Sequence, residues 1–157
     1  PTKYSQCPPC LSYHEGIPCY TADMASKTVY LNWDSESKFV LNDRDNYQLR
    51  VNGAGNIGSA DLLPMSLIGC SAYDVVEILE KQRQELHQLK VTAEAQQDDT
   101  PPWKFRKIHI RYQVIGKGIQ LEKAQKAIQL SEEKYCSVYA TLRDVIEITH
   151  EVEVLEA

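Results

Sequence analysis

The sequence predicts an α+β fold in which antiparallel sheet packs against helices, and three observations carry this prediction. Short stretches in which apolar and polar residues alternate indicate strands. Between them lies a stretch, Leu62–Val76, that is apolar or small on every face of a helix. A second helical stretch, Leu121–Leu130, has a single apolar stripe. Strands and helices in this mixed order are typical of a layered α+β domain.

Three short antiparallel strands are expected before the first helix. Two polar turns, at 34–37 and 42–46, separate the alternating stretches. The apolar positions of the three strands are Val29, Leu31 and Trp33, then Phe39 and Leu41, then Tyr47, Leu49 and Val51. The glycine-containing segment 52–58 then links the strands to the helix. Its glycine spacing fits neither a P-loop nor a dinucleotide-binding fingerprint, so it is not interpreted as a phosphate loop.

The long apolar helix is the centre of the predicted fold. Asp61 is a candidate N-cap, which would place Pro64 in the first turn, where its missing N–H is tolerated. Cys70 lies near the middle of the helix, and residues after Glu77 become polar. Because its apolar residues cover all faces, the helix is expected to be enclosed by protein on every side.

The second half of the chain is predicted to alternate strands with a helix. Strands are expected at Leu89–Ala95 and Ile108–Val114, the second with a polar outer face. Glycines at 116 and 118 turn the chain into the helix Leu121–Leu130. Cys136 follows in a loop or short helix, and a final strand alternates from Ile146 to Val154.

Composition excludes several classes of function. The 157 residues suit one domain, and the formal charge of −5 with scattered lysines and arginines argues against a nucleic-acid partner. No apolar run of about 18 residues and no signal peptide are recognised, so no membrane association is expected. Five cysteines without a framework spacing indicate reduced thiols in a cytoplasmic protein.

The first 23 residues are interpreted as an extension, and the domain is expected to span 24–157. The extension is rich in proline and has no periodicity, so it is expected to be disordered or introduced by cloning. Two alternatives stay open. Cys7, Cys10, His14 and Cys19 have the residue types of a zinc site, and Cys7 with Cys10 could form a redox dithiol. We expect no bound zinc here.

The two cysteines of the domain allow two interpretations. Cys70 and Cys136 are 66 positions apart and belong to different elements. Each alone is typical of a small buried core residue, because free cysteine is among the most buried residue types. Folding could also bring the two together as a dithiol pair, and the sequence around them favours this second interpretation.

The segments around both cysteines resemble the signatures of the OsmC-like family, which includes the organic hydroperoxide resistance proteins. The first segment contains Gly58-Ser59, Leu67-Ile68-Gly69-Cys70 and Asp74-Val75-Val76, and the second is Leu130–Val138. The resemblance covers the chain from about Met24 onward. It implies antiparallel sheets wrapped around two central helices in an intertwined homodimer.

The resemblance also implies a thiol-dependent peroxidase without a cofactor or a metal. Cys70 would attack the peroxide as a thiolate and become a sulfenic acid, and Cys136 would condense with it to a disulfide. The implied substrate is an organic hydroperoxide. The implied reductant is an external dithiol, either lipoyl-type or thioredoxin-like.

The chain departs from the peroxidase members of this family near the first cysteine. Those members carry a glutamate just before the Asp61 position and an arginine in the N-terminal strands. Here Ala60 occupies the glutamate position, and no arginine stands in the first two strands. Asp61, Lys38 and Arg50 are therefore the candidate supporting charges. The alternative function is a non-enzymatic, stress-related dimer that binds a small apolar ligand.

Overall fold

The structure, a computed structural model, describes residues 27–33, 39–51 and 56–157. The four possible zinc ligands of the extension and Lys38 therefore lie outside the described residues. In chain order the elements are β1 (Tyr30–Trp33), β2 (Phe39–Asn42), β3 (Gln48–Val51), α1 (Leu62–Lys81), β4 (Glu85–Gln97), β5 (Phe105–Lys117), α2 (Leu121–Leu130), α3 (Ser137–Leu142) and β6 (Glu147–Glu156). A 3₁₀ turn, Ser59–Asp61, leads into α1, and a π-helical turn, Ser131–Tyr135, separates α2 from α3. The predicted α+β class is confirmed.

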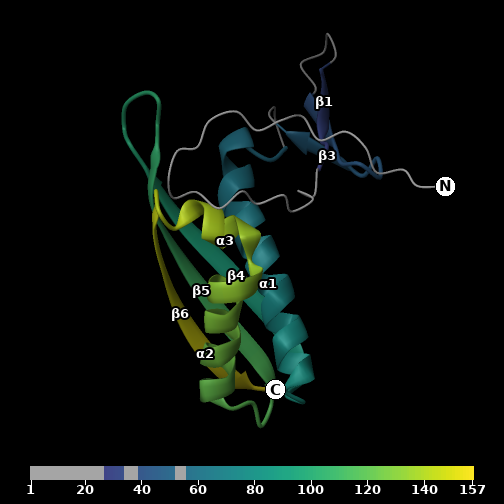
Figure 1. Ribbon diagram of the computed structural model, residues 1–157, viewed down its shortest axis with the longest axis vertical. Helices are drawn as coiled ribbons and strands as arrows, with labels where there is room; N and C mark the ends of the chain where they lie inside the picture. Colours follow the sequence, from purple (N-terminus) through teal and green to yellow (C-terminus); the bar gives the residue numbers. More distant parts are fainter. Residues whose placement is uncertain (1–26, 34–38, 52–55) are drawn as a thin grey trace, which may run out of the picture.

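The three short strands form a small antiparallel sheet in the order β1-β2-β3, as predicted. Trp33 of β1 pairs with Phe39 of β2, and Phe39 also pairs with Val51 of β3. Most of the side chains of β1 and β3 are exposed. Figure 1 shows this sheet near the N-terminal end of α1.

The three long strands form a second sheet in the order β4-β5-β6. β4 and β5 pair antiparallel, but β5 and β6 pair parallel, so this sheet is mixed rather than wholly antiparallel as expected. The physical reason is the connection between them. A parallel pair needs a crossover, and the chain between β5 and β6 contains two helices and a turn that carry it back along the sheet.

The two faces of β5 have different environments. Ile108, Ile110, Tyr112 and Val114 are buried on the inner face. The outer face carries ion pairs, in which Arg111 contacts Glu94 and Glu151 on the neighbouring strands and Lys107 contacts Glu147. The predicted polar outer face of this strand is therefore confirmed.

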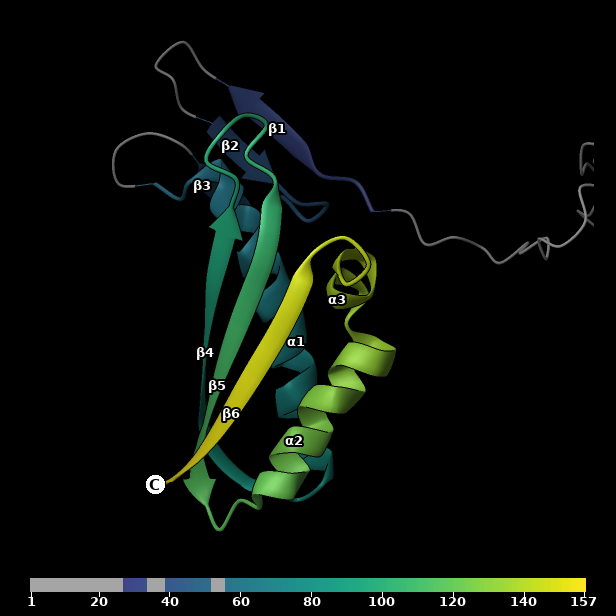
Figure 2. The same cartoon turned by 90° about the vertical axis from the view of Figure 1, so that its left-hand side faces the viewer.

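Helices α1 and α2 cover the inner face of the long sheet, as Figure 2 shows from the side. The buried residues of α1 are Leu67, Ser71, Val75 and Leu79, which repeat every fourth position and form one stripe. Ala124, Ala127 and Ile128 form the buried stripe of α2. These stripes and the inner face of β5 make the hydrophobic core.

The single chain does not enclose α1 on every side, contrary to the sequence-based expectation. Outside the buried stripe, Met65 is 42% exposed and Tyr73 is 69% exposed. By length and composition Ser59–Lys81 could also cross a membrane, whereas no such apolar run was expected from the sequence. Of its most apolar 18-residue stretch, 22% is buried. Core helices of globular proteins meet the same criterion. The apolar helix thus keeps a second face that the described residues leave exposed.

The turn from β5 into α2 depends on close backbone approach at Gly116. A Cβ atom at this position would collide with the carbonyl oxygen of Glu85, which pairs with the end of β5. Gly118 follows with a positive φ of 59°, in the left-handed region that glycine adopts without strain. The two predicted turn glycines therefore have separate reasons to be glycine.

The buried stripe of α1 gives a stability prediction. Leu67→Ala is expected to lower the free energy of unfolding by about 2–5 kcal/mol, because Leu67 is fully buried and its truncation leaves a cavity. Leu121→Ala is the matched control, since Leu121 is exposed on α2 and its loss should change stability by about 0.5 kcal/mol or less. Urea denaturation measures both. Equal effects of the two substitutions would contradict the described packing of α1.

Candidate active site

Cys70 and Asp74 are brought together by the geometry of α1. Residues four apart on a helix lie one turn apart on the same face. With 100° per residue, both lie on the same side of the buried Ser71. Cys70 and Asp74 are each half-buried, so this face of the helix is only partly accessible to solvent.

Cys136 reaches the same place from the junction between the π-helical turn and α3. Its backbone N–H donates to the carbonyl oxygen of Ser131 at 2.8 Å, and its sulfur accepts the backbone N–H of Tyr139 at 3.3 Å. The cysteine is thus the N-cap of α3. Burial is the main cause that raises the pKa of the Cys136 thiol to about 11, and the contact with Cys70 raises it further.

The two cysteine sulfurs and a carboxylate oxygen of Asp74 all lie within 4.8 Å of one another. Both cysteines are free thiols. Because an S–S bond is about 2 Å long, a modest approach of the two sulfurs would suffice to form a disulfide. The arrangement therefore suits thiol redox chemistry, and thiolate and carboxylate groups are also metal ligands.

A buried hydroxyl network supports this cluster. The Ser71 and Tyr112 hydroxyls share a hydrogen bond of 2.6 Å, and Ser131 Oγ lies 3.4 Å from Ser71 Oγ. Ser131 also donates to Asp74 Oδ2 at 2.9 Å. Burial raises the pKa of Tyr112 to about 12, so the phenol stays protonated and can donate.

Asp74 and this network were not among the site residues predicted from the sequence. A signal was present for two members. Ser71 is the polar residue in a buried stripe of four-residue spacing, and Tyr112 places a hydroxyl on the apolar face of β5. Buried hydroxyls need hydrogen-bond partners, so they mark a place where elements are held together by polar contacts. Ser131 gave no comparable signal, because the π-helical turn that buries it was not predicted.

An ion pair lies next to this network. Glu132 Oε1 is 2.8 Å from His150 Nδ1, and the glutamate side chain is largely buried. The His150 ring also packs edge-on against Tyr112, with ring centroids 6.3 Å apart. The contact with Glu132 is the main cause that raises the pKa of His150 above its ordinary value of 6.5.

Two of the three candidate supporting charges, Asp61 and Arg50, lie among the described residues. Asp61 is exposed at the N-cap position of α1, where its side chain makes no capping hydrogen bond. It precedes Cys70 by nine residues, which is roughly 14 Å along the helix axis. Arg50 is exposed on β3, and Lys38 is outside the described residues. Their supporting roles stay predictions.

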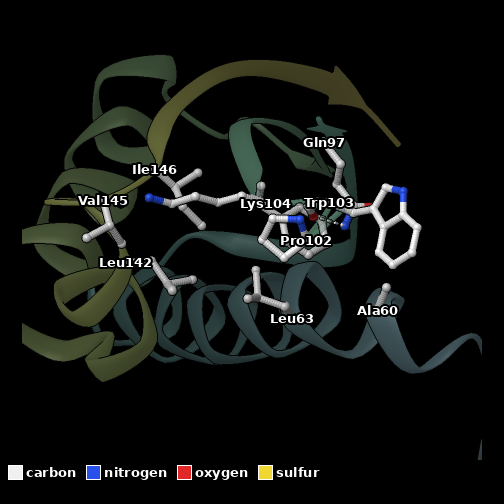
Figure 3. Close-up of a pocket in the computed structure, with 10 residues that line it drawn as sticks. Ala60, Leu63, Gln97, Pro102, Trp103, Lys104, Leu142, Val145 and Ile146 are labelled. Carbon is white, nitrogen blue, oxygen red and sulfur yellow. Dashed lines mark hydrogen bonds between the residues drawn. The ribbon is translucent and has the colours of Figure 1, made fainter. Parts of the chain in front are cut away.

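An apolar pocket of about 600 Å³ opens at the N-terminal end of α1. As Figure 3 shows, Leu63 of α1 faces it from one side, and Leu142, Val145 and Ile146 close one end. Trp103 and Lys104, from the β4–β5 connection, lie on its other side. Leu63 and Cys70 are seven residues apart, so they lie on nearly the same face of α1, about two turns from each other.

Comparisons with protein families and with individual proteins both find similar sequences. The model of the OsmC-like protein family matches residues 53–151. Protein YhfA of Escherichia coli strain K12 is 32% identical over 132 residues, which cover 81% of this chain and 97% of YhfA.

Solved structures share the fold. A hypothetical protein from Aquifex aeolicus VF5 superimposes with a TM-score of 0.77 and 28% identity, over 85% of this chain and 99% of that protein. An organic hydroperoxide resistance protein, OsmC, from Legionella pneumophila superimposes with a TM-score of 0.61 and 13% identity, over 85% of this chain and all of that protein. The second likeness shows the fold alone.

The Glu132–His150 pair gives a pH-dependent stability prediction. The folded-state pKa of His150 is raised, so its stabilisation is fully present below pH 6.5 and is lost as the pH rises through the folded-state pKa. The stability difference between the unmodified chain and His150→Gln should therefore be larger at pH 6 than at pH 8.5, as measured by urea denaturation. In Glu132→Gln, NMR titration should find the His150 pKa lowered. An unchanged pKa would show that Glu132 is not its cause.

Proposed function

The chain belongs to the OsmC-like protein family, as its two cysteine segments predict, and we propose that it is a thiol-dependent peroxidase that reduces organic hydroperoxides in the cytoplasm. One observation carries this proposal: the sulfurs of Cys70 and Cys136 lie within 4.8 Å of each other although the residues are far apart in sequence. A pair of free thiols so close can cycle between dithiol and disulfide.

The environments of the two thiols support different roles. Cys136 is buried, and its raised pKa of about 11 leaves little thiolate at neutral pH. It is therefore a poor attacking group. Cys70 is half-buried and more accessible, so it is the sulfur that meets the peroxide. Cys136 is then the sulfur that attacks the sulfenic acid formed on Cys70.

The proposed steps balance as follows. The Cys70 thiolate attacks the peroxide O–O bond, which breaks, and the alkoxide that leaves takes a proton to become an alcohol. Cys70 is now a sulfenic acid. The Cys136 sulfur attacks it, the S–S bond forms, and the hydroxyl of the sulfenic acid leaves with the Cys136 proton as water. An external dithiol, lipoyl-type or thioredoxin-like, then reduces the disulfide. The Asp74 carboxylate, whose oxygen lies within 4.8 Å of both sulfurs, is the candidate group to relay the Cys136 proton to the departing hydroxyl.

The alternative function, a dimer that binds a small apolar ligand without chemistry, is favoured by the pocket of Figure 3. Its volume of about 600 Å³ lies within the range of small-molecule sites. The two functions predict different reactions of the thiols with peroxide. A binding protein should lose its Cys70 and Cys136 thiols to peroxide slowly or only after unfolding, whereas the enzyme should lose both on stoichiometric oxidation.

A homodimer is part of the proposal. Helix α1 is as apolar as a membrane-spanning helix, and its Met65 and Tyr73 side chains are exposed in the single chain. A second copy that packs its own α1 against this face would remove the exposed apolar surface from water. This arrangement agrees with the intertwined homodimer that the family resemblance implies.

The peroxidase proposal predicts different defects for the two cysteines. Cys70→Ser should abolish peroxide consumption, because the attacking sulfur is gone. Cys136→Ser should permit one turnover and leave a sulfenic acid on Cys70 that dimedone traps. Mass spectrometry and a peroxide-consumption assay measure these outcomes in full-length protein that carries Cys7→Ser, Cys10→Ser and Cys19→Ser, so that no other thiol reacts.

Two results would exclude the peroxidase. One is a Cys70 that alkylates no faster than a free thiol at neutral pH, together with turnover no better than that of a small-molecule thiol. The other is identical behaviour of the two serine variants. With either result, the ligand-binding alternative remains, and calorimetry with apolar ligands would test it.

The homodimer predicts a mass of two chains in sedimentation equilibrium at micromolar concentration. Met65→Lys should shift the population toward monomer, because it places a charge on the exposed apolar face of α1. Leu121→Lys is the matched control, since Leu121 is similarly exposed but lies on α2. A monomeric unmodified chain, or equal effects of both substitutions, would contradict an interface built on α1.

A further inference from the structure

We propose that the reduced chain binds one zinc ion through Cys70, Asp74 and Cys136. This site goes beyond the peroxidase and does not depend on it, because it requires only that both thiols be reduced. It also differs from the sequence-based expectation that the domain holds no metal. Thiolate, thiolate and carboxylate form a ligand set suited to zinc, whose catalytic and open sites use three protein ligands and a fourth exchangeable position.

The distances fit a zinc site after a small adjustment. Tetrahedral zinc with bonds of about 2.3 Å to sulfur and about 2.0 Å to oxygen needs its ligand atoms roughly 3.5–3.8 Å apart. The three donor atoms here lie within 4.8 Å of one another. Movements of about 1 Å or less, within the reach of side-chain rotation, would close the site. Cys70 and Asp74 are already one helical turn apart on α1, so two ligands share a rigid support.

Contacts around the ligands are those of a supported metal site. Ser131 donates a hydrogen bond of 2.9 Å to Asp74 Oδ2, which orients the carboxylate. The backbone N–H of Tyr139 donates to the Cys136 sulfur at 3.3 Å, which would stabilise a thiolate there. Hydrogen bonds to ligating groups of this kind orient the ligands and raise metal affinity.

A surface pocket lies next to the proposed site. It has a volume of about 190 Å³ and is lined by Asp74 together with Tyr73, Glu77, Ile78, Lys81 and Tyr135. Asp74 therefore borders both the pocket and the cysteine cluster. The carboxylates of Asp74 and Glu77 give the pocket a negative character, although Lys81 pairs with Glu77 at 2.9 Å.

Zinc binding and thiol oxidation would exclude each other at this site. Coordination converts both thiols to thiolates and releases their two protons to solvent, so the affinity should fall as the pH is lowered. A disulfide between Cys70 and Cys136 removes two of the three ligands. Zinc would in turn shield both sulfurs from oxidants, so the occupied site is expected to be slow to oxidise.

Cobalt(II) is the probe for a direct test, because thiolate coordination gives it charge-transfer and tetrahedral d–d absorption bands. The protein is the full chain with Cys7→Ser, Cys10→Ser and Cys19→Ser, which removes the thiols of the N-terminal extension. We expect one equivalent of cobalt to bind the reduced protein, zinc to displace it, and oxidation to the disulfide to abolish both. None of these readings involves peroxide turnover, so they are independent of the proposed function.

Five substitutions sharpen the test. Cys70→Ser and Asp74→Asn should each remove at least tenfold of the affinity, and Ser131→Ala should weaken it by about 10–100-fold through the lost carboxylate contact. Asp144→Asn, at an exposed carboxylate, is the matched control and should change nothing. Circular dichroism checks that each variant is folded. No cobalt uptake by the reduced chain, unchanged uptake in Cys70→Ser, or a loss caused instead by Glu77→Gln would overturn the proposal.

Discussion

The hydrogen bond between the Ser71 and Tyr112 hydroxyls sets the rotation of α1 against the long sheet, and the cysteine cluster depends on that rotation. Both groups are buried, so breaking this contact would cost the Tyr112 hydroxyl its hydrogen bond and leave Ser71 with the longer 3.4 Å contact to Ser131. The apolar stripe of α1 alone would tolerate some sliding and rotation, because hydrophobic contact has no direction. A directed contact in the middle of the stripe removes that freedom. It places Cys70 and Asp74 beside Cys136.

The proposed thiol chemistry depends on the different environments of the two cysteines. Cys136 sits where a π-helical turn changes into α3, and this junction buries its sulfur while the Tyr139 backbone still donates to it. Cys70 lies on a helix face that the chain covers only in part. This difference in burial separates an accessible sulfur from a protected one.

The sequence was sufficient for the parts of the fold governed by local periodicity. The bounds of α2 agree with the predicted helix from Leu121 to Leu130, although Leu121, which was expected in its buried stripe, is exposed. The polar outer face of β5 was indicated by the alternation of apolar and polar residues. Strand direction was not predictable in this way, because alternation is the same in parallel and antiparallel strands, and β6 proved parallel to β5. The pairing of Cys70 with Cys136 came from a family resemblance, since no local pattern measures a distance across 66 positions. Asp74 shares a helix face with Cys70, but its contacts with Ser131 and Cys136 come from another segment of the chain, so its part in the site was not recognised.

The ladder of ion pairs on the outer face of β5 limits how copies of this chain can associate. Its charged groups lie in water and are matched across the strands, as in the contact of Arg111 with Glu151, so covering them would cost desolvation with little gain. Among the described residues, exposed apolar side chains lie on the opposite side, at α1, and also on the small sheet. An association through the α1 face would leave the ion pairs of β5 in water. If two copies met there about a two-fold axis, each would cover the same face of the other, and that contact would be complete at two copies.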